Sequence, residues 1–498
     1  MIDLTLGDPA ALERAVDRAR QRNIIIPTLK QQKTPGLVPA SIRTRLEEIG
    51  LWDVNPLNLF RITWHNQPVS RGGRFGEVNL IEFPTQLTGV EARIVSLVGK
   101  WFPTGAHKVG AAFGCLVPPL VTGRFDPSRE KAVWPSTGNY CRGGAYDSNL
   151  LGCESIAILP EGMSRERFDW LASVAGETIK TPGSESNVKE IFDKCWELRR
   201  SGQNLAIFNQ FEEFGNYLWH YEVTGSAMME VLGRIMGEVD QFRGTVLTTG
   251  SAGTLASGDY LKQHFPASKI VASEALQCPT LLQNGFGAHR IEGIGDKHVP
   301  WIHNVKNTDL VVAIDDAAAI SLMRVFNEPA GQDYLADQGV SAETLSQLPL
   351  LGISSIANLL SCIKCARYYE LGGNDILLTV ATDSMEMYAS RLQELNEERG
   401  PFTRVAAAAG FHRYLMGAGV SDMCELSHYD RKRIHNLKYF TWVEQQGKTY
   451  EEIQAQWYDP DYWTRIQGCA RRVDALIDAF NQRTGLLREI EGAGPHRS

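Results

Sequence analysis

The stretch Trp101-Phe-Pro-Thr-Gly-Ala-His-Lys108 places a lysine at the end of a Gly- and Pro-bearing turn, directly before the apolar run from Val109 to Pro118. This order predicts a helix that begins at the lysine and packs into the core. An amine confined there loses hydration, so its pKa falls and the neutral form becomes a nucleophile for carbonyl groups. Taken alone, the octapeptide also fits a surface lysine at a helix start.

Composition describes an ordinary globular chain of two or three domains: 498 residues, 43% hydrophobic, 22% charged, net charge −8. The negative charge and the lack of a basic run argue against a nucleic-acid partner. We expect no membrane helix and, because Met1 to Glu13 lacks a signal-peptide pattern, a cytoplasmic location. The nine dispersed cysteines suit free thiols. The pair Cys362 and Cys365 lies in an apolar helical run, which favours buried helix thiols over a metal site, and we expect no metal.

Short apolar runs alternate with helical patterns from about residue 90 to 390. The expected strands are 132–134, 155–159, 177–181, 206–208, 244–248, 270–274, 310–314 and 375–380. Such alternation predicts an α/β protein with two doubly wound parallel-sheet domains and a cleft between them. We expect an N-terminal extension over 1–90 that packs on the core, a smaller α/β domain over 91–215, a larger one over 216–393 and a helical C-terminal extension over 394–498.

Three further motifs each join an expected strand or loop to a helix. Gly250-Ser-Ala-Gly-Thr254 could cradle a phosphate with backbone N–H groups, and without a P-loop lysine it suits a monophosphate better than a triphosphate. Ser136-Thr-Gly-Asn139 could hold a carboxylate, and Asn139 could bond a phenolic oxygen. Gly352-Ile-Ser-Ser355 puts a hydroxyl at a helix start. Each fits an ordinary turn or cap by itself. Together with the lysine they match the needs of pyridoxal phosphate bound to an amino acid.

The order of these motifs resembles the fold-type II pyridoxal-phosphate enzymes, especially cysteine synthase and cystathionine β-synthase, over about residues 90 to 390. Thr104 to Lys108 also matches the lysine motif of tryptophan synthase β. Further matching segments are Pro160-Glu-Gly-Met-Ser-Arg-Glu-Arg167, Gly287-Ala-His-Arg-Ile-Glu-Gly-Ile-Gly295 and Thr382-Asp-Ser384.

The resemblance implies a role for each matching residue. Lys108 would form the internal aldimine and move the α-proton, and Asn139 would bond the cofactor's O3′. Ser354 would face the ring nitrogen. The implied phosphate ligands are Gly250, Ser251, Ala252, Gly253 and Thr254, and the implied substrate ligands are Ser136, Thr137, Gly138, Asn139 and Gln210. The implied reaction is β-elimination or β-replacement on a β-substituted α-amino acid, such as serine, O-activated serine or cysteine, through an aminoacrylate, in a homodimer.

The chain departs from the family pattern at Tyr140-Cys-Arg142, so we expect a different pocket wall. Arg142 could recognise a second acidic group on the substrate or pair with a surface acid. Ala252 replaces a glycine, which is tolerable if its φ stays negative. Two alternatives remain: a hydroxy-amino-acid dehydratase on the same fold, and a catalytically silent protein that binds the cofactor or a partner.

Overall fold

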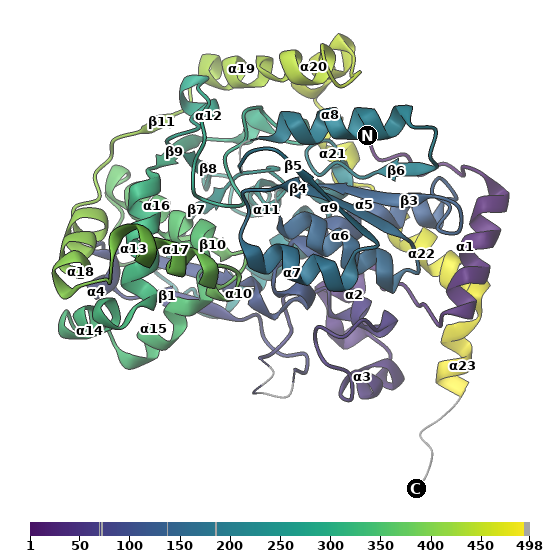
Figure 1. Cartoon of the computed structure of the whole chain (residues 1–498), viewed down its shortest axis with the longest axis horizontal. Helices are drawn as coiled ribbons and strands as arrows, with labels where there is room; N and C mark the ends of the chain where they lie inside the picture. The colour runs from purple at the N-terminus through teal and green to yellow at the C-terminus, as the bar shows by residue number, and fades with distance from the viewer. Residues whose placement is uncertain (69, 71–72, 137, 185–186, 493–498) are drawn as a thin grey trace, which may run out of the picture.

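The computed structural model describes the chain except residues 69, 71–72, 137, 185–186 and 493–498 (Figure 1). Two β-sheets with helices on both faces form the centre of the molecule. The protein is therefore α/β with doubly wound sheets, as the strand–helix alternation predicts. In the described part of the chain, no helix is both long and apolar enough to cross a membrane.

The larger sheet has the strand order β1-β2-β10-β7-β8-β9-β11. Its strands are β1 (Leu80–Phe83), β2 (Arg93–Val98), β7 (Gln241–Thr248), β8 (Lys269–Ala275), β9 (Leu310–Ile314), β10 (Asp375–Ala381) and β11 (Met423–Glu425). The two edge strands pair antiparallel with their neighbours, and the inner strands are parallel. Thus β2, from the segment expected to form the smaller domain, belongs to this sheet, and so does β11, from a segment expected to be helical.

The smaller sheet is fully parallel, in the order β5-β4-β3-β6. Its strands are β3 (Lys131–Pro135), β4 (Ser155–Pro160), β5 (Glu177–Thr181) and β6 (Leu205–Ile207). Strand β5 begins and ends at the expected residues; β4 differs by one residue at one end, and β3 and β6 differ by one residue at both ends. The central strands β3 and β4 are buried almost throughout, and such parallel strands read as continuous apolar runs in the sequence.

Helices divide the core between the faces of the two sheets. In the larger sheet, apolar side chains of α16 (Ile353–Tyr368) pack on one face, and those of α10 (Gly225–Ile235) and α11 (Leu255–Lys262) pack on the other. In the smaller sheet, α8 (Val188–Arg200) covers one face and α6 (Asn139–Leu150) the other.

Helix α5 (Lys108–Val121) is buried almost throughout and lies against α6 and against α9 (Phe214–Trp219). Gly114 and Gly215 allow the crossing with α9, because a Cβ at either position would lie within 2.4 Å of the other helix's backbone oxygen. This close packing anchors the helix that carries Lys108.

The remaining helices cover the sheets or lie in the terminal segments (Figure 1). They are α1 (Pro9–Gln21), α2 (Leu29–Lys33), α3 (Ala40–Leu46), α4 (Thr85–Thr88), α7 (Arg165–Val174), α12 (Thr280–Gln283), α13 (Asp316–Asn327), α14 (Pro329–Asp337), α15 (Ala342–Gln347), α17 (Ala389–Arg399), α18 (Arg404–Gly410), α19 (His428–Asn436), α20 (Tyr450–Tyr458), α21 (Tyr462–Gln467), α22 (Ala470–Thr484) and α23 (Leu486–Gly492). Figure 1 shows the C-terminal segment crossing the molecule from α18 over α19 and α20 to α22 beside α1.

The two terminal segments pack on each other as well as on the core. The Asn481 side chain exchanges two hydrogen bonds with the backbone of Ile26, at 3.1 and 2.7 Å. Asp474 accepts from the backbone N–H groups of Leu29 and Lys30 at the start of α2. Burial raises the pKa of Asp474 to about 6. The division of the chain into four segments remains our proposal for its organisation.

Candidate functional site

One pocket brings together most of the residues that the sequence singled out. Nine of them line it: Lys108, Ser136, Asn139, Gln210, Gly250, Ser251, Ala252, Thr254 and Ser354. Gly138 and Gly253 belong to the same two loops but do not line the pocket, and Thr137 lies outside the described residues. Four motifs spread over nearly 250 residues of sequence therefore meet at one place.

Lys108 is the first residue of α5, as the apolar run after it predicts. Its side chain is half-buried, and its Nζ donates to the Ser251 Oγ at 3.0 Å. The turn before it contains Thr104 at φ 70° and Gly105 at φ 73°. Left-handed backbone is uncommon for a β-branched residue, so this turn is strained at Thr104. The turn and the buried helix together direct the amine toward the 250–254 loop.

His107 is a pocket residue that the sequence argument passed over, although it lies inside the lysine motif. Its Nε2 lies 3.2 Å from the Thr382 Oγ1, and its ring packs near Trp64 and His220. Burial, helped by the charge on Lys108, lowers the pKa of His107 to about 3. The imidazole is therefore neutral, and it adds no second positive charge beside the lysine.

The 250–254 loop joins β7 to the start of α11. Ala252 has φ 64°, so the expectation of a negative φ there is wrong. The left-handed turn changes the direction of the chain within the loop, which is how successive backbone N–H groups come to point toward one anion. A Cβ at Gly253 would lie 2.1 Å from the Asn216 Oδ1. The Asn216 amide in turn donates to the Ser251 Oγ at 3.0 Å, so Asn216 supports this loop from behind.

The loop between β3 and α6 is held by its own serine. The Ser136 Oγ accepts from the Gly138 N–H at 3.1 Å and from the Gln210 Nε2 at 3.3 Å. Gly138 has φ 154°, and a Cβ there would lie 2.5 Å from the Arg167 Nε. A glycine is needed at this position for both reasons. Gln210 joins this loop, as the sequence suggested.

Asn139 begins α6 and lies between two oppositely charged side chains. Its Nδ2 donates to the Asp383 Oδ2 at 2.7 Å, and its Oδ1 accepts from the Arg142 Nη1 at 3.3 Å. Arg142 is buried and has no carboxylate within ion-pair distance among the described residues. It also does not line the pocket. The interpretation of Arg142 as the partner of a surface acid is therefore wrong, and its contact with the substrate stays a prediction.

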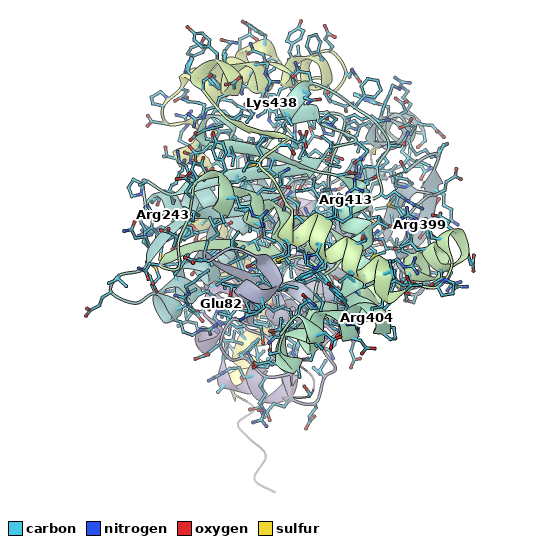
Figure 2. The ribbon with its side chains drawn as sticks, turned by 90° about the vertical axis from the view of Figure 1, so that its left-hand side faces the viewer. Glu82, Arg243, Arg399, Arg404, Arg413 and Lys438 are labelled. Carbon is cyan, nitrogen blue, oxygen red and sulfur yellow. The ribbon has the colours of Figure 1, made fainter. Side chains whose placement is uncertain are left out.

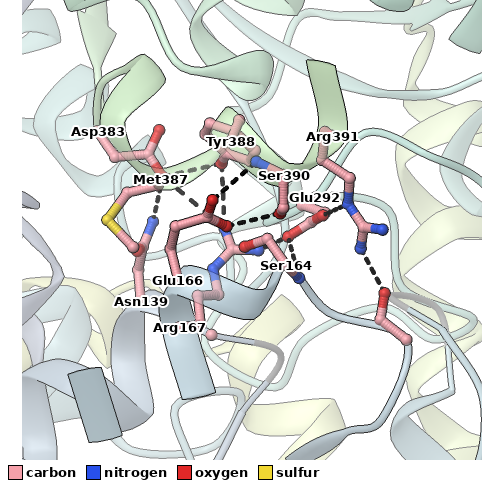
Figure 3. Close-up of polar contacts among 12 residues, drawn as sticks. Asn139, Ser164, Glu166, Arg167, Glu292, Asp383, Met387, Tyr388, Ser390 and Arg391 are labelled. Carbon is pink, nitrogen blue, oxygen red and sulfur yellow. Dashed lines mark hydrogen bonds and ion pairs between the residues drawn. The ribbon is translucent and has the colours of Figure 1, made fainter. Parts of the chain in front are cut away.

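A buried polar network continues from Asp383 across the molecule (Figure 3). The Asp383 Oδ2 also accepts from the Tyr388 hydroxyl at 2.9 Å, and that hydroxyl accepts from the Arg167 Nη2 at 3.0 Å. Arg167 forms an ion pair with Glu292, to which Arg391 also donates. Ser164 stands at the N-cap of α7, but its hydroxyl makes no capping bond. The network links α7, beside the smaller sheet, to the segment that follows β10.

Ser354 and Asp296 also line the pocket. Ser354 is the second residue of α16 and is buried; the N-cap itself is Gly352, so the serine hydroxyl is not used as the cap. Asp296 is the one carboxylate among the described lining residues. Asp296 directly follows the segment Gly287 to Gly295, which matches a family motif. That position in the sequence could have identified Asp296 as a candidate site residue, but the sequence analysis did not use it.

Comparisons with known proteins agree with this arrangement. The model of the family "Pyridoxal-phosphate dependent enzyme" matches residues 101–333. A cysteine synthase of Staphylococcus aureus is 29% identical over 290 residues, which cover 58% of this chain and 84% of that protein. Cystathionine β-synthase of Saccharomyces cerevisiae is 24% identical over 312 residues, which cover 61% and 58%.

The family model and these relatives make the chain similar to the pyridoxal-phosphate-dependent enzymes of fold type II. Its fold is similar to that of the O-acetylserine-dependent cystathionine β-synthase of Helicobacter pylori, with a TM-score of 0.53, 22% identity and coverage of 63% and 95%. It is also similar to the O-acetylserine sulfhydrylase isoform 3 of Entamoeba histolytica, with a TM-score of 0.55, 21% identity and coverage of 68% and 94%.

The chemistry of the pocket's own residues fits pyridoxal phosphate. An amine, a strained loop at a helix start and buried hydroxyls all line one cavity. Several buried polar atoms around it have no hydrogen-bond partner in the described structure: Thr104 Oγ1, His107 Nδ1, Asn216 Oδ1, Thr249 Oγ1 and Ser355 Oγ. Buried polar groups are normally paired, so such a cluster is expected where a polar ligand binds.

Proposed function

We propose that this enzyme catalyses β-elimination or β-replacement on a β-substituted α-amino acid, such as serine, O-activated serine or cysteine. The placement of Lys108 opposite the 250–254 loop supports this proposal most directly: the amine lies 3.0 Å from the Ser251 Oγ. The sequence similarity to cysteine synthase and cystathionine β-synthase supports the same class of reaction.

When bound, pyridoxal phosphate supplies an aldehyde for an amine and a ring that accepts negative charge from the substrate's α-carbon. Gly250 to Thr254 would hold its phosphate with backbone N–H groups at the start of α11. Ser354 would meet the ring nitrogen with a hydroxyl, which does not hold that nitrogen protonated as a carboxylate would. Charge is then less delocalised into the ring, and loss of a β-substituent is favoured over transamination.

The other residues would bind and orient the substrate. Ser136, Gly138 and Gln210 belong to one hydrogen-bonded loop, and there they would hold the substrate carboxylate. Asn139 would donate to the cofactor's phenolic oxygen. The Lys108 Nζ would take the proton from the substrate's α-carbon after the substrate amine has replaced it. Neutral His107 beside it keeps the local charge low.

Lys108→Ala tests the proposal directly. The wild-type protein given pyridoxal phosphate should show a visible absorbance band, and borohydride should fix the cofactor to the peptide that contains Lys108. The variant should lose both the fixation and α-proton exchange on every amino acid of a serine, O-acetylserine and cysteine panel. A variant that still fixed the cofactor, or still exchanged the α-proton, would contradict the role of Lys108.

Product analysis on the same panel separates the possible reactions. Keto acid and ammonia released without an added thiol indicate elimination, including the dehydratase alternative; a new amino acid formed only with an added nucleophile indicates replacement. Cofactor binding without α-proton exchange on any substrate would favour the catalytically silent alternative. The homodimer remains a prediction from family resemblance, which the mass of the protein in solution tests.

A further inference from the structure

Arg142 is a buried cation with an unusual set of partners. It is 3% exposed, and its Nε has no hydrogen-bond partner in the described structure. Its guanidinium lies over the Trp170 ring at 4.7 Å. Burial, together with the neighbouring Arg167, lowers the pKa of Arg142 to about 10, so it stays charged at neutral pH. Burying a charge without an acidic partner costs folding free energy. Packing alone therefore does not explain why an arginine stands at this position.

Arg142 makes three hydrogen bonds: one goes to the Met387 Sδ at 3.2 Å, and the other two reach the two segments that shape the pocket. Its Nη2 donates to the Thr104 carbonyl at 2.7 Å, in the strained turn before Lys108. Its Nη1 donates to the Asn139 Oδ1 at 3.3 Å. Arg142 stands one helical turn after Asn139, so α6 fixes their spacing. One side chain thus ties the lysine turn to the loop that carries the candidate phenol ligand.

The orientation of the Asn139 amide follows from the chemistry of its neighbours. A guanidinium only donates and a carboxylate only accepts, so the oxygen must face Arg142 and the nitrogen must face Asp383. Asp383 is held in turn, because its Oδ1 sits against Gly352, where a Cβ would lie 1.8 Å away, and the Gly352 N–H donates to the Asp383 carbonyl. The other charged or titratable groups that act on Arg142 are Arg167, Cys141 and Tyr388.

Both neighbours polarise the Asn139 amide in the same direction. The cation draws electron density toward the oxygen, and the anion accepts one of the two N–H groups. Hydrogen bonds in such chains strengthen one another, which makes the second N–H a better donor. Asn139 lines the pocket, so that N–H is available to a ligand there.

We propose that Arg142 is a positioning residue that, with Asp383, fixes and polarises the Asn139 amide as the donor to the phenolic oxygen of pyridoxal phosphate. This inference rests on the proposed function of the pocket. It also accounts for the charged residue at a position where the sequence departs from its family pattern. The bound anionic oxygen would provide the negative charge that Arg142 lacks in the described structure.

The test compares Arg142→Met, Arg142→Lys and Asp383→Asn with the wild type. Two quantities are measured on each: the dissociation constant for pyridoxal phosphate, and the pH midpoint of the visible absorbance of the bound cofactor. Arg61→Met serves as the matched control. Arg61 is also buried at 3% exposure and donates to backbone carbonyls and an asparagine, but it belongs to the N-terminal segment and lies outside the pocket lining.

We expect Arg142→Met and Asp383→Asn to weaken cofactor binding about tenfold, the worth of about one hydrogen bond. A weaker donor leaves more negative charge on the phenolic oxygen, so the protonated form should persist to higher pH, by about 0.5 unit or more. Arg142→Lys should fall between, because it keeps the charge but not the planar pair of donors. Arg61→Met should lower the melting temperature without moving either quantity.

An Arg142→Met protein with wild-type affinity and an unmoved pH midpoint overturns the proposal and leaves Arg142 a packing residue. If that variant does not fold, the same two measurements on Arg142→Lys decide in the same way. Failure of the wild-type protein to fix pyridoxal phosphate would instead refute the proposed function, so the two failures are distinguishable.

Discussion

Lys438 in the C-terminal segment and Arg142 beside the pocket are both buried cations without a described carboxylate at ion-pair distance, yet their surroundings differ. The Lys438 Nζ donates to the carbonyls of Trp301 and His303, at 2.9 and 2.8 Å, and to the Gln456 Oε1 at 2.6 Å. Three acceptors match the three N–H bonds of one ammonium. The Arg142 Nε, in contrast, has no described partner. The two oxygen atoms that accept from Arg142 belong to Thr104 and Asn139, in the segments that shape the pocket.

The difference separates a structural contact from a site prepared for a ligand. Figure 2 shows Lys438 beneath the C-terminal helices, where it fastens the segment after α19 to the loop that contains Trp301. All three N–H bonds of the Lys438 ammonium are satisfied, so this cation keeps no free donor for a ligand. Around the pocket, in contrast, strained backbone and unpaired buried groups gather at Thr104, Ala252, Asn216 and Asp383. The first region should therefore govern stability, and the second should govern cofactor binding.

The largest effect should come from Lys438→Met. The variant fills similar volume but removes three buried hydrogen bonds, and it leaves the Gln456 Oε1 without its donor, while the Trp301 and His303 carbonyls each keep one other donor. We therefore expect a loss of about 3 kcal/mol in the free energy of unfolding. Urea titration measures it. Affinity for pyridoxal phosphate should stay at the wild-type value, and a matching loss of affinity would mean that the two regions are not separate.

Gly253→Ala should have the converse effect at the pocket. The added Cβ would lie 2.1 Å from the Asn216 Oδ1, and Asn216 supports Ser251. We expect cofactor affinity to fall by one to two orders of magnitude, equivalent to about 1.4–2.8 kcal/mol, as measured by titration with pyridoxal phosphate. Gly233→Ala is the control, because no heavy atom lies within 4 Å of a Cβ there. In the interior of α10 that substitution should stabilise slightly, and equal effects of the two variants would refute the prediction.

The sequence reveals these two regions unequally. The strand at 310–314 and the helix beginning at Lys108 were predicted, because local apolar runs decide them. The pocket motifs were found because each is local and short. Asn139 and Asp383, however, are 244 residues apart in sequence, and nothing local shows that they meet. The burial of Lys438 and the positive φ of Ala252 likewise depend on packing against distant segments. The charged, aromatic sequence around Lys438 does not indicate its burial, and an alanine does not indicate a positive φ.

Glu274 near the end of β8, outside the pocket lining, tests whether a buried acid makes the stability depend on pH. It accepts from the N–H groups of Leu281 and Leu282, but burial dominates and raises its pKa from 4.5 to about 8. Between these values the unfolded chain loses the proton that the folded chain keeps, so stability should fall as pH rises, by at most about 1.4 kcal/mol per pH unit. Glu274→Gln should remove this slope from urea midpoints measured across that range.

The Glu274→Gln comparison has an internal check. An amide offers one acceptor oxygen where the carboxyl offers two, so one of the two N–H groups loses its partner and the variant should be less stable near pH 4.5. The deficit should shrink as pH rises. A constant difference at every pH would show that Glu274 does not titrate in this window. Burial also raises the pKa of other acids, such as that of Glu213 to about 7. These acids titrate in both proteins, so their contributions cancel in the stability difference between wild type and variant.

The smallest effect should come from Ala252→Gly, which relaxes the pocket without removing a contact. An alanine at φ 64° carries a conformational cost of about 1 kcal/mol that glycine avoids, while glycine adds some entropy to the unfolded chain. The net gain in unfolding free energy should be about 0.5 kcal/mol, measured by urea titration. The same change at Ala227, buried in the interior of α10 at ordinary helical geometry, should instead destabilise. If Ala252→Gly also destabilises the protein, the backbone at Ala252 is not strained. The contrast between the pocket and the Lys438 region would then depend on the unpaired polar groups alone.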